Sequence, residues 1–334
     1  GCWTAALNGW MSARAWPKHN SSAPPLKPAE QVVILTEPGL GSASSLIPHN
    51  FLALPQERSS LDAAKVALIP VPYDSTTSFR SGSRDGPEAM ITASYGLEDY
   101  DFELELDVSE IGIHTTGALE PHMAGPGPMT ERIESVVASY IGMGKTVGLL
   151  GGEHSITIGS VRAHVEAYPG LSVLYLDAHA DLRDEYMGTP FGHASAARRA
   201  YECCPIALAG VRSLCQEEHD FIRENNVPVW YWGADPVSSS LESVLDSLSD
   251  TVYVSVDLDV LDPALMPAVG TPEPGGMAWH QLVSLLGKVA ASRRIVGFDV
   301  CELAPADGPP ACFYTAAKLV YKLVAYACGG KQVS

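Results

Sequence analysis

Three short clusters of metal-ligand residue types occur along the chain, and each follows directly on a run of apolar residues. The clusters are residues 151–155 (GGEHS), residues 177–181 (DAHAD) and residues 257–259 (DLD). In an extended segment alternate residues project to the same side, so Asp177, His179 and Asp181 are expected to face one space. The pattern predicts that imidazole and carboxylate groups converge at the ends of buried strands.

Together the clusters supply four carboxylates and two imidazoles: Asp177, Asp181, Asp257, Asp259, His154 and His179. Four unpaired carboxylates in an apolar cleft would repel one another and raise each other's pKa values. Two divalent cations would balance their charge. Oxygen and imidazole donors without thiolate favour Mn²⁺, leave Fe, Co, Ni and Zn open, and exclude a thiolate structural zinc site. Bridging carboxylates can hold two metals roughly 3.5–4 Å apart, the spacing at which two-metal hydrolases polarise water to hydroxide.

Each cluster also has a simpler structural interpretation. A lone D-x-D after a strand is usually a turn or a cap, and a lone Gly-Gly-x-His is mostly a tight turn. The alternating ligands of residues 177–181 are more specific, and the convergence of all three clusters favours an active site. Residues 151–152 do not begin a phosphate loop, because the G-x-G-x-x-G pattern and the G-K-[ST] ending are both absent.

The elements that must position these clusters are predicted from residue 64 onward. Six short apolar runs, rich in β-branched residues, are typical of strands buried on both faces: residues 66–69, 146–150, 172–176, 206–209, 252–256 and 295–298. Helical stretches lie between them, at residues 130–143, 158–168, 217–225, 280–291 and 313–327. The alternation predicts a single three-layer α/β/α domain with a mostly parallel sheet over residues 65–330. Ligands of such sheets gather at the carboxyl ends of the strands, where the three clusters lie.

Residues 1–64 are predicted to be an N-terminal extension. The first 29 residues contain basic side chains but no acid, and they are rich in Ser, Ala and Pro. A trimmed or tagged end, an organelle transit-like segment and a family-specific extension are the open interpretations. We favour an extension that is part linker and part subunit contact.

The overall composition excludes several classes of protein. There are 39 acidic and 21 basic residues, and the resulting charge of −18 argues against nucleic-acid binding and suits a cationic substrate. No apolar run reaches the roughly 18 residues of a membrane span, and the most apolar stretch, residues 313–328, carries two lysines. Seven cysteines, an odd number in a long chain, fit a reducing compartment. A cytoplasmic location is expected, or an organelle if residues 1–29 are transit-like.

With several further segments, the three clusters resemble the ureohydrolase family of arginases and agmatinases. The resemblance covers about residues 65–328 and also rests on residues 72–80 (PYDSTTSFR), 86–90 (GPEAM), 93–98 (ASYGLE), 210–213 (GVRS), 255–263 (SVDLDVLDP), 270–276 (GTPEPGG) and 316–322 (AAKLVYK). It implies an arginase-like fold and a homo-oligomer, either a trimer or a hexamer.

The resemblance also implies a pair of manganese ions. One would be held by His154, Asp177, Asp181 and Asp257, and the other by Asp177, His179, Asp257 and Asp259. In this arrangement Asp177 and Asp257 bridge the two ions. Ni²⁺ is an alternative to Mn²⁺, because geometry and metal supply decide between them as much as donor type.

For catalysis, the resemblance implies that metal-bound hydroxide attacks a guanidinium carbon. Asp181 would receive the proton of the hydroxide and pass it to the leaving amine. Glu302 would grip the guanidinium through charge-assisted hydrogen bonds, and His193 matches the family's mobile acid–base histidine. Taken alone, Glu302 could be a surface charge and His193 a polar loop residue.

The expected substrate is agmatine, cleaved to putrescine and urea. Arginase is disfavoured, because this sequence has DLR at residues 181–183, the position at which arginases of the family have an Asp-x-Asn motif. Guanidine, guanidinobutyrate and guanidinopropionate are the alternatives. Trp279 bears on this choice: inside the pocket it would favour a small substrate such as guanidine, whereas under the loop it would belong to the core.

Two other classes share parts of the pattern. Histone-deacetylase-like enzymes have the same α/β architecture and a related Asp-x-His element, but they use one zinc and hydrolyse acyl amides. His154, Asp181 and Asp259 complete a second metal site that such enzymes lack. A non-catalytic binding subunit would be expected to lose ligands, and none is missing here.

Overall fold

The computed structural model describes residues 46–233 and 241–328. The predictions made for residues 1–45 lie outside the described residues. Part of the predicted extension is described, and it contains η1 (Phe51–Ala53) and α1 (Gln56–Ser59). Phe51, Leu52 and Leu54 are buried in the same core cluster as the central strands. The boundary between residues 64 and 65 stays a prediction.

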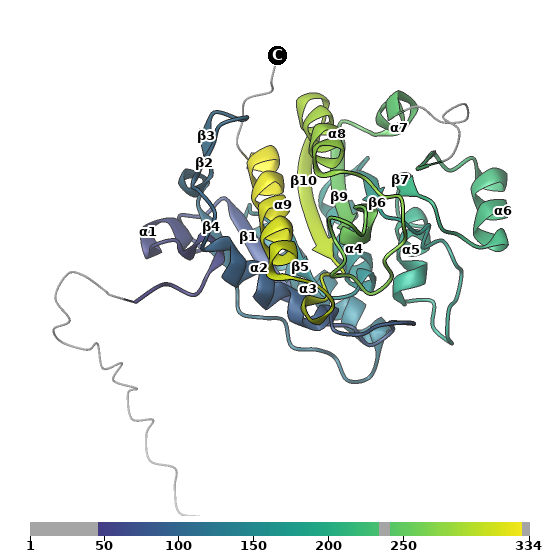
Figure 1. Ribbon diagram of the computed structural model, residues 1–334, viewed down its shortest axis with the longest axis horizontal. Helices are drawn as coiled ribbons and strands as arrows, with labels where there is room; N and C mark the ends of the chain where they lie inside the picture. The colour runs from purple at the N-terminus through teal and green to yellow at the C-terminus, as the bar shows by residue number, and fades with distance from the viewer. Residues whose placement is uncertain (1–45, 234–240, 329–334) are drawn as a thin grey trace, which may run out of the picture. The chain divides into compact units, whose positions relative to one another are not determined.

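Eight strands form one sheet in which every neighbouring pair is parallel (Figure 1). Their order across the sheet is β4-β1-β5-β10-β9-β6-β7-β8. The six predicted runs correspond to β1 (Val66–Val71), β5 (Thr146–Gly151), β6 (Ser172–Leu176), β7 (Ile206–Val211), β9 (Thr251–Asp257) and β10 (Arg294–Cys301). Nearly every residue in these strands is buried, because helices cover both faces of the sheet. The predicted parallel sheet is confirmed.

The two edge strands, β4 (Ile113–Thr115) and β8 (Val229–Tyr231), were not predicted from the sequence. Each has three residues, which is too short to give a clear apolar run. A separate antiparallel pair, β2 (Tyr100–Asp101) and β3 (Leu106–Asp107), lies outside the main sheet. Short elements of this kind depend on neighbouring strands for their pairing, so local sequence carries little signal for them.

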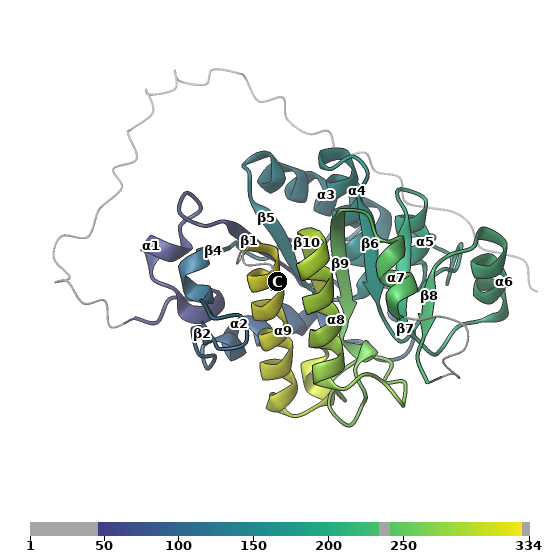
Figure 2. The same cartoon turned by 90° about the horizontal axis from the view of Figure 1, so that it is seen from above.

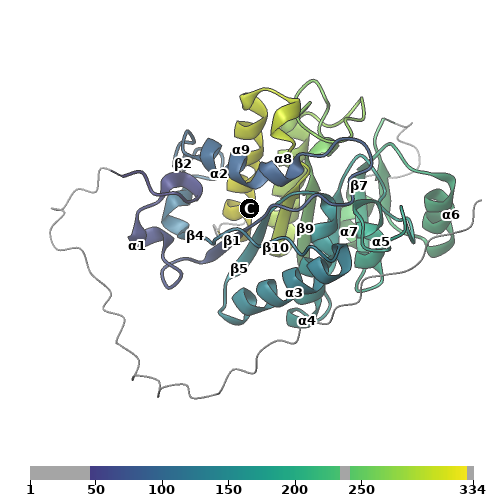
Figure 3. The ribbon, with the colours of Figure 1, turned by 90° about the horizontal axis from the view of Figure 1, so that it is seen from below.

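Helices cover the sheet in two layers, which completes the predicted three-layer domain (Figures 2 and 3). One layer packs into the largest core cluster and comprises α2 (Gly86–Ser94), α7 (Leu241–Ser247), α8 (Trp279–Ser292) and α9 (Pro310–Cys328). The opposite layer comprises α3 (Pro126–Gly142), α4 (Thr157–Ala167), α5 (Ala196–Tyr201) and α6 (Gln216–Asn225). Both layers leave the carboxyl ends of the strands free for functional side chains.

The apolar helix α9 packs inside the domain. It contributes ten buried residues, among them Lys322, whose ammonium contacts Asp101 and Glu103 near the β2–β3 pair. Across residues 46–233 and 241–328, no helix combines the length and the apolarity needed to cross a membrane. The six cysteines in these ranges all carry free thiols.

A buried histidine lies between α4 and β10 on one face of the sheet. His164 is fully buried, and its Nδ1 lies 2.8 Å from the carbonyl oxygen of Ser160. A Cβ atom at Gly297 would come within 2.1 Å of the His164 Nε2, so only glycine allows this approach. Burial lowers the pKa of His164 to about 4, and contacts with backbone at Ser160 and Val296 offset this only in part.

This histidine should make the domain sensitive to acid. In the unfolded chain this histidine has a pKa near 6.5, whereas in the folded chain its pKa is about 4. The free energy of unfolding therefore falls as the pH drops from about 6.5 to about 4. The expected loss from this group is about 2 kcal/mol between pH 7 and pH 5. In urea denaturation of metal-free protein, His164→Leu should lose that much less stability over the same interval. The half-exposed His219 serves as the control through His219→Gln, and equal losses in wild type and His164→Leu would contradict the prediction.

Candidate active site

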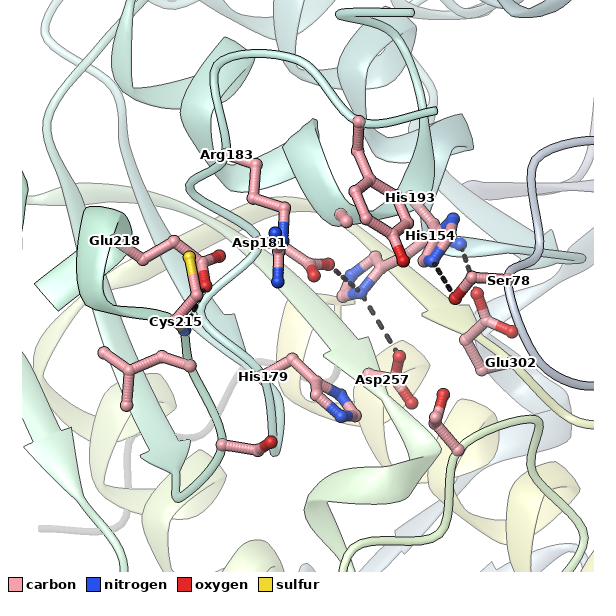
Figure 4. Close-up of a pocket in the computed structure, with 15 residues that line it drawn as sticks. Ser78, His154, His179, Asp181, Arg183, His193, Cys215, Glu218, Asp257 and Glu302 are labelled. Carbon is pink, nitrogen blue, oxygen red and sulfur yellow. Dashed lines mark hydrogen bonds and ion pairs between the residues drawn. The ribbon is translucent and has the colours of Figure 1, made fainter. Parts of the chain in front are cut away.

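Four neighbouring strands deliver the candidate residues to one edge of the sheet. In the order β5, β10, β9 and β6, their carboxyl ends lead to His154, Glu302, Asp257 and Asp177. These residues are up to 148 positions apart in the sequence, the separation of His154 and Glu302, which nevertheless share a hydrogen bond. Figure 4 shows the side chains of His154, Glu302 and Asp257 around one cavity together with His179 and Asp181. The three sequence clusters are therefore adjacent in space.

Three carboxylates surround one imidazole nitrogen. The Nδ1 of His154 lies 3.0 Å from Asp177 Oδ2, 3.4 Å from Asp257 Oδ2 and 3.6 Å from Asp181 Oδ2. All four side chains are buried. Convergence of one nitrogen and three oxygens on one point is the arrangement of a divalent cation site.

A second group of donors lies beside the first and shares Asp177 with it. The Nδ1 of His179 lies 2.9 Å from Asp259 Oδ2 and 3.4 Å from Asp177 Oδ1. Asp177 thus directs one carboxylate oxygen to each imidazole. Asp257 connects the groups differently, because its Oδ1 accepts the backbone N–H of Asp259 at 2.7 Å while its Oδ2 faces His154.

Hydrogen bonds behind the cluster fix the orientation of its members. The Nε2 of His154 lies 2.8 Å from Ser255 Oγ, and that hydroxyl donates to Asp299 at 2.7 Å. These two hydrogen bonds orient the His154 ring so that its Nδ1 faces the carboxylates, as an outer hydrogen bond commonly does for a metal-binding histidine. Tyr175 stacks on the His154 ring at 4.4 Å, and its hydroxyl donates to Asp181 Oδ2 at 2.8 Å.

The charge balance of the cluster fits bound cations. Burial, followed by repulsion from Asp177, raises the pKa of Asp181 well above its ordinary value. Burial also raises the pKa of Asp257 and of Asp259, and neighbouring carboxylates add to the effect. Within residues 46–233 and 241–328, the four carboxylates form ion pairs only with the two histidines. Divalent ions would remove the repulsion, so the donor set fits them.

Two of the candidate catalytic carboxylates have strained backbones. Asp181 has a φ of 49° and Glu302 a φ of 69°, both in the left-handed region that non-glycine residues rarely occupy. Such conformations cost of order 1–3 kcal/mol each and are found mainly where function requires them. The folded protein is therefore less stable by this backbone strain, and the strained conformations direct these two side chains into the cavity.

Glu302 and His193 line the same cavity, which has a volume of about 230 Å³. Glu302 Oε1 accepts the backbone N–H of His154 at 2.7 Å, and burial raises the pKa of the Glu302 carboxyl well above its ordinary value. His193 begins the short helix η5 (His193–Ser195), and burial lowers the pKa of its imidazole to about 4. Six of the eight residues predicted for catalysis or metal binding therefore line this cavity, and the other two, Asp177 and Asp259, contact the lining histidines His154 and His179.

Several residues that shape this site had no predicted role. Thr76 and Ser78 contact the His193 ring nitrogens at 3.2 Å and 3.3 Å. Both belong to residues 72–80, a segment that was identified from the sequence only by its resemblance to the family and for whose hydroxyl groups no function was predicted. Tyr175 lies inside an apolar run, where its packing role masks its hydrogen bond to Asp181. Arg183 and Tyr186 also line the cavity.

Trp279 packs against the core and is absent from the described cavity wall. It begins α8 and lies partly buried against the largest core cluster. The alternative in which it shortens the pocket is therefore disfavoured. Trp279→Ala should lower thermal stability but leave the order of preference among the substrates expected from the sequence unchanged, as measured by kcat/KM for each. A reordering of the substrates would contradict this placement.

Known proteins resemble the chain in both sequence and fold. Residues 64–326 match the family model described as the Arginase family. The chain is similar to the N(1)-aminopropylagmatine ureohydrolase of Synechocystis sp., with 38% identity over 290 residues that cover 84% of this chain and 94% of that protein. It is also similar to the agmatinase of Halalkalibacterium halodurans, with 34% identity over 257 residues that cover 75% and 88%. The crystal structure of the agmatine ureohydrolase of Thermoplasma volcanium gives a TM-score of 0.74 at 32% identity and covers 85% of this chain and 95% of that one.

Proposed function

We propose, since the chain belongs to the arginase family, that this ureohydrolase cleaves the guanidino group of agmatine, or of agmatine extended by an aminopropyl group, to urea and an amine. One observation carries the proposal. Glu302 lies in the same cavity as the His and Asp cluster, and its Oε1 is held by a backbone N–H while Oε2 is left for a ligand. A buried carboxylate beside cation-binding donors suits a guanidinium, which forms charge-assisted hydrogen bonds in a planar fork.

Two divalent ions are part of the proposal. We assign one to His154, Asp177, Asp181 and Asp257, and the other to Asp177, His179, Asp257 and Asp259. Mn²⁺ is the favoured metal and Ni²⁺ the alternative, because the donors are oxygen and imidazole without thiolate. When bound, such ions lower the pKa of water and thereby supply a nucleophile at neutral pH.

The chain's own residues would then orient the substrate and move protons. Glu302 would hold the guanidinium with its carbon facing the cluster. Asp181 Oδ2 accepts from Tyr175, so Oδ1 is the atom that would take the proton of the attacking water. As the water oxygen bonds to the guanidinium carbon, the bond from that carbon to the alkyl nitrogen breaks. The proton would pass to that nitrogen, with His193 as acid–base partner at the cavity wall.

A substrate with an acidic tail is the second candidate, and Arg183 favours it. The Arg183 guanidinium lines the cavity and lies over the Tyr186 ring at 4.8 Å. Among residues 46–233 and 241–328, no acidic side chain forms an ion pair with it. An unpaired guanidinium in the wall could bind the carboxylate of guanidinobutyrate or guanidinopropionate.

Urea release across a substrate panel tests the proposal. Protein loaded with Mn²⁺, and in parallel with Ni²⁺, is given agmatine, its aminopropyl derivative, arginine, guanidinobutyrate, guanidinopropionate and guanidine. The highest kcat/KM is expected for one of the first two with Mn²⁺. A higher kcat/KM for guanidinobutyrate or guanidinopropionate would favour the second candidate, a substrate with an acidic tail. Absence of urea from every compound would overturn the proposed activity.

A further inference from the structure

We propose that Thr76 and Glu153 are positioning residues that fix the tautomer and the direction of His193. The inference rests on the proposed function, in which His193 is the acid–base partner. Its basis is a continuous chain of hydrogen bonds from the buried Glu153 carboxylate through the Thr76 hydroxyl to the His193 ring. Glu153 has no exposed surface, and the proposed reaction gives it no other role.

The first link joins Glu153 to Thr76 through two bonds. The Thr76 backbone N–H donates to Glu153 Oε2 at 2.7 Å, and the Thr76 hydroxyl donates to Oε1 at 2.8 Å. Ser155 Oγ donates to the same Oε1 at 2.6 Å. Because the Thr76 hydroxyl donates to Oε1, its single proton is committed to this side.

The second link follows from that commitment. Thr76 Oγ1 has only lone pairs left for His193, and it contacts both the backbone N–H at 3.1 Å and the ring Nδ1 at 3.2 Å. The Nδ1 must therefore carry a hydrogen. In a neutral imidazole this leaves Nε2 as the acceptor, and Nε2 lies 3.3 Å from Ser78 Oγ at the cavity wall. Figure 4 shows Ser78 and His193 directed toward each other. The nitrogen that exchanges protons thus faces the site.

The backbone is shaped to allow this contact. A Cβ atom at Gly152 would lie 2.0 Å from the Tyr73 carbonyl oxygen, so glycine is required where the Glu153 turn meets the loop after β1. A Cβ atom at Gly192 would lie 3.4 Å from Thr76 Oγ1. Three loops, which follow β1, β5 and β6, therefore meet closely at the Thr76 hydroxyl. Orientation of an acid–base group by an outer hydrogen bond is a recurring device at active sites.

Two variants of Thr76 separate orientation from packing. Thr76→Val replaces the hydroxyl by a methyl group of similar size, and Thr76→Ser keeps the hydroxyl. In metal-loaded enzyme, Thr76→Val should lower kcat by about 10- to 100-fold with little change in KM or in the number of bound metals. Thr76→Ser should restore most of kcat. Thr76→Ala replaces Thr76→Val if the added methyl prevents folding.

A spectroscopic readout keeps this inference independent of the proposed activity. Nitrogen-15 NMR of histidine-labelled, Zn²⁺-loaded protein reports which ring nitrogen of His193 carries hydrogen, with His193→Gln used for assignment. The Nδ1–H tautomer is expected in wild type and Thr76→Ser, and its loss is expected in Thr76→Val. An Nε2–H tautomer in wild type, or unchanged kcat and tautomer in Thr76→Val, would overturn the inference. Absence of urea release with the expected tautomer would count against the proposed function alone.

Discussion

Asp177→Asn is expected to abolish most urea release, lowering kcat by roughly 10³-fold or more. Asp177 is the residue that directs one oxygen to each imidazole, so its loss weakens both donor groups at once. Metal ions in hydrolase sites contribute several kcal/mol to transition-state stabilisation, and each 1.4 kcal/mol is about a tenfold change in rate. Metal content after equilibrium dialysis against Mn²⁺ should fall from two ions per chain to one or none.

Asp250→Asn is the matched control for this variant. Asp250 is exposed and directly precedes β9, at the end of the sheet opposite the candidate site. The control should bind two Mn²⁺ ions and keep wild-type kcat. If Asp177→Asn also kept two ions and wild-type activity, the cluster would not be the metal site.

Glu302→Gln should lower kcat/KM by about 10³-fold while leaving metal binding intact. The amide oxygen of Gln can still accept the His154 N–H, so the local backbone contact survives. What disappears is the negative charge opposite a buried guanidinium, and removing one partner of such a pair costs about 2–5 kcal/mol. Steady-state urea release at varied agmatine concentration measures the effect.

The surface variant Glu110→Gln controls for loss of one carboxylate from an acidic protein. Glu110 is exposed and pairs with Arg58 far from the cavity residues in sequence. It should change kcat/KM by less than about twofold, since exposed ion pairs contribute little. A Glu302→Gln enzyme with wild-type kcat/KM would place the guanidinium elsewhere.

The central strands and the places of the three polar clusters at their ends were predictable because their signals are local. A buried parallel strand such as β6 gives a continuous apolar run, and residues 177–181 follow it directly. The order of the strands carries no local signal, because pairing of β5 with β10 joins segments about 150 residues apart. Sequence therefore predicted which residues follow strands but not which strands are neighbours.

The side chains that support the site were missed for a related reason. Thr76 and Glu153 acquire their roles only when loops distant in sequence meet at the Thr76 hydroxyl. The sequence left two placements for the Trp279 side chain, in the pocket or in the core. Tertiary packing at the start of α8 places it against the core. The positive φ values at Asp181 and Glu302 also have no signature in the sequence, since Glu rarely adopts one and Asp does so at only a minority of positions.

The central claim is that the His and Asp cluster binds two divalent ions that make the chain a guanidino hydrolase. The most direct test titrates metal-free protein with Mn²⁺ and records urea release from agmatine against the number of ions bound per chain. Activity is expected to be absent without metal and to reach its maximum at two ions per chain. Full activity in metal-free protein, or binding of two ions with no urea released from any guanidino compound of the panel, would contradict the account.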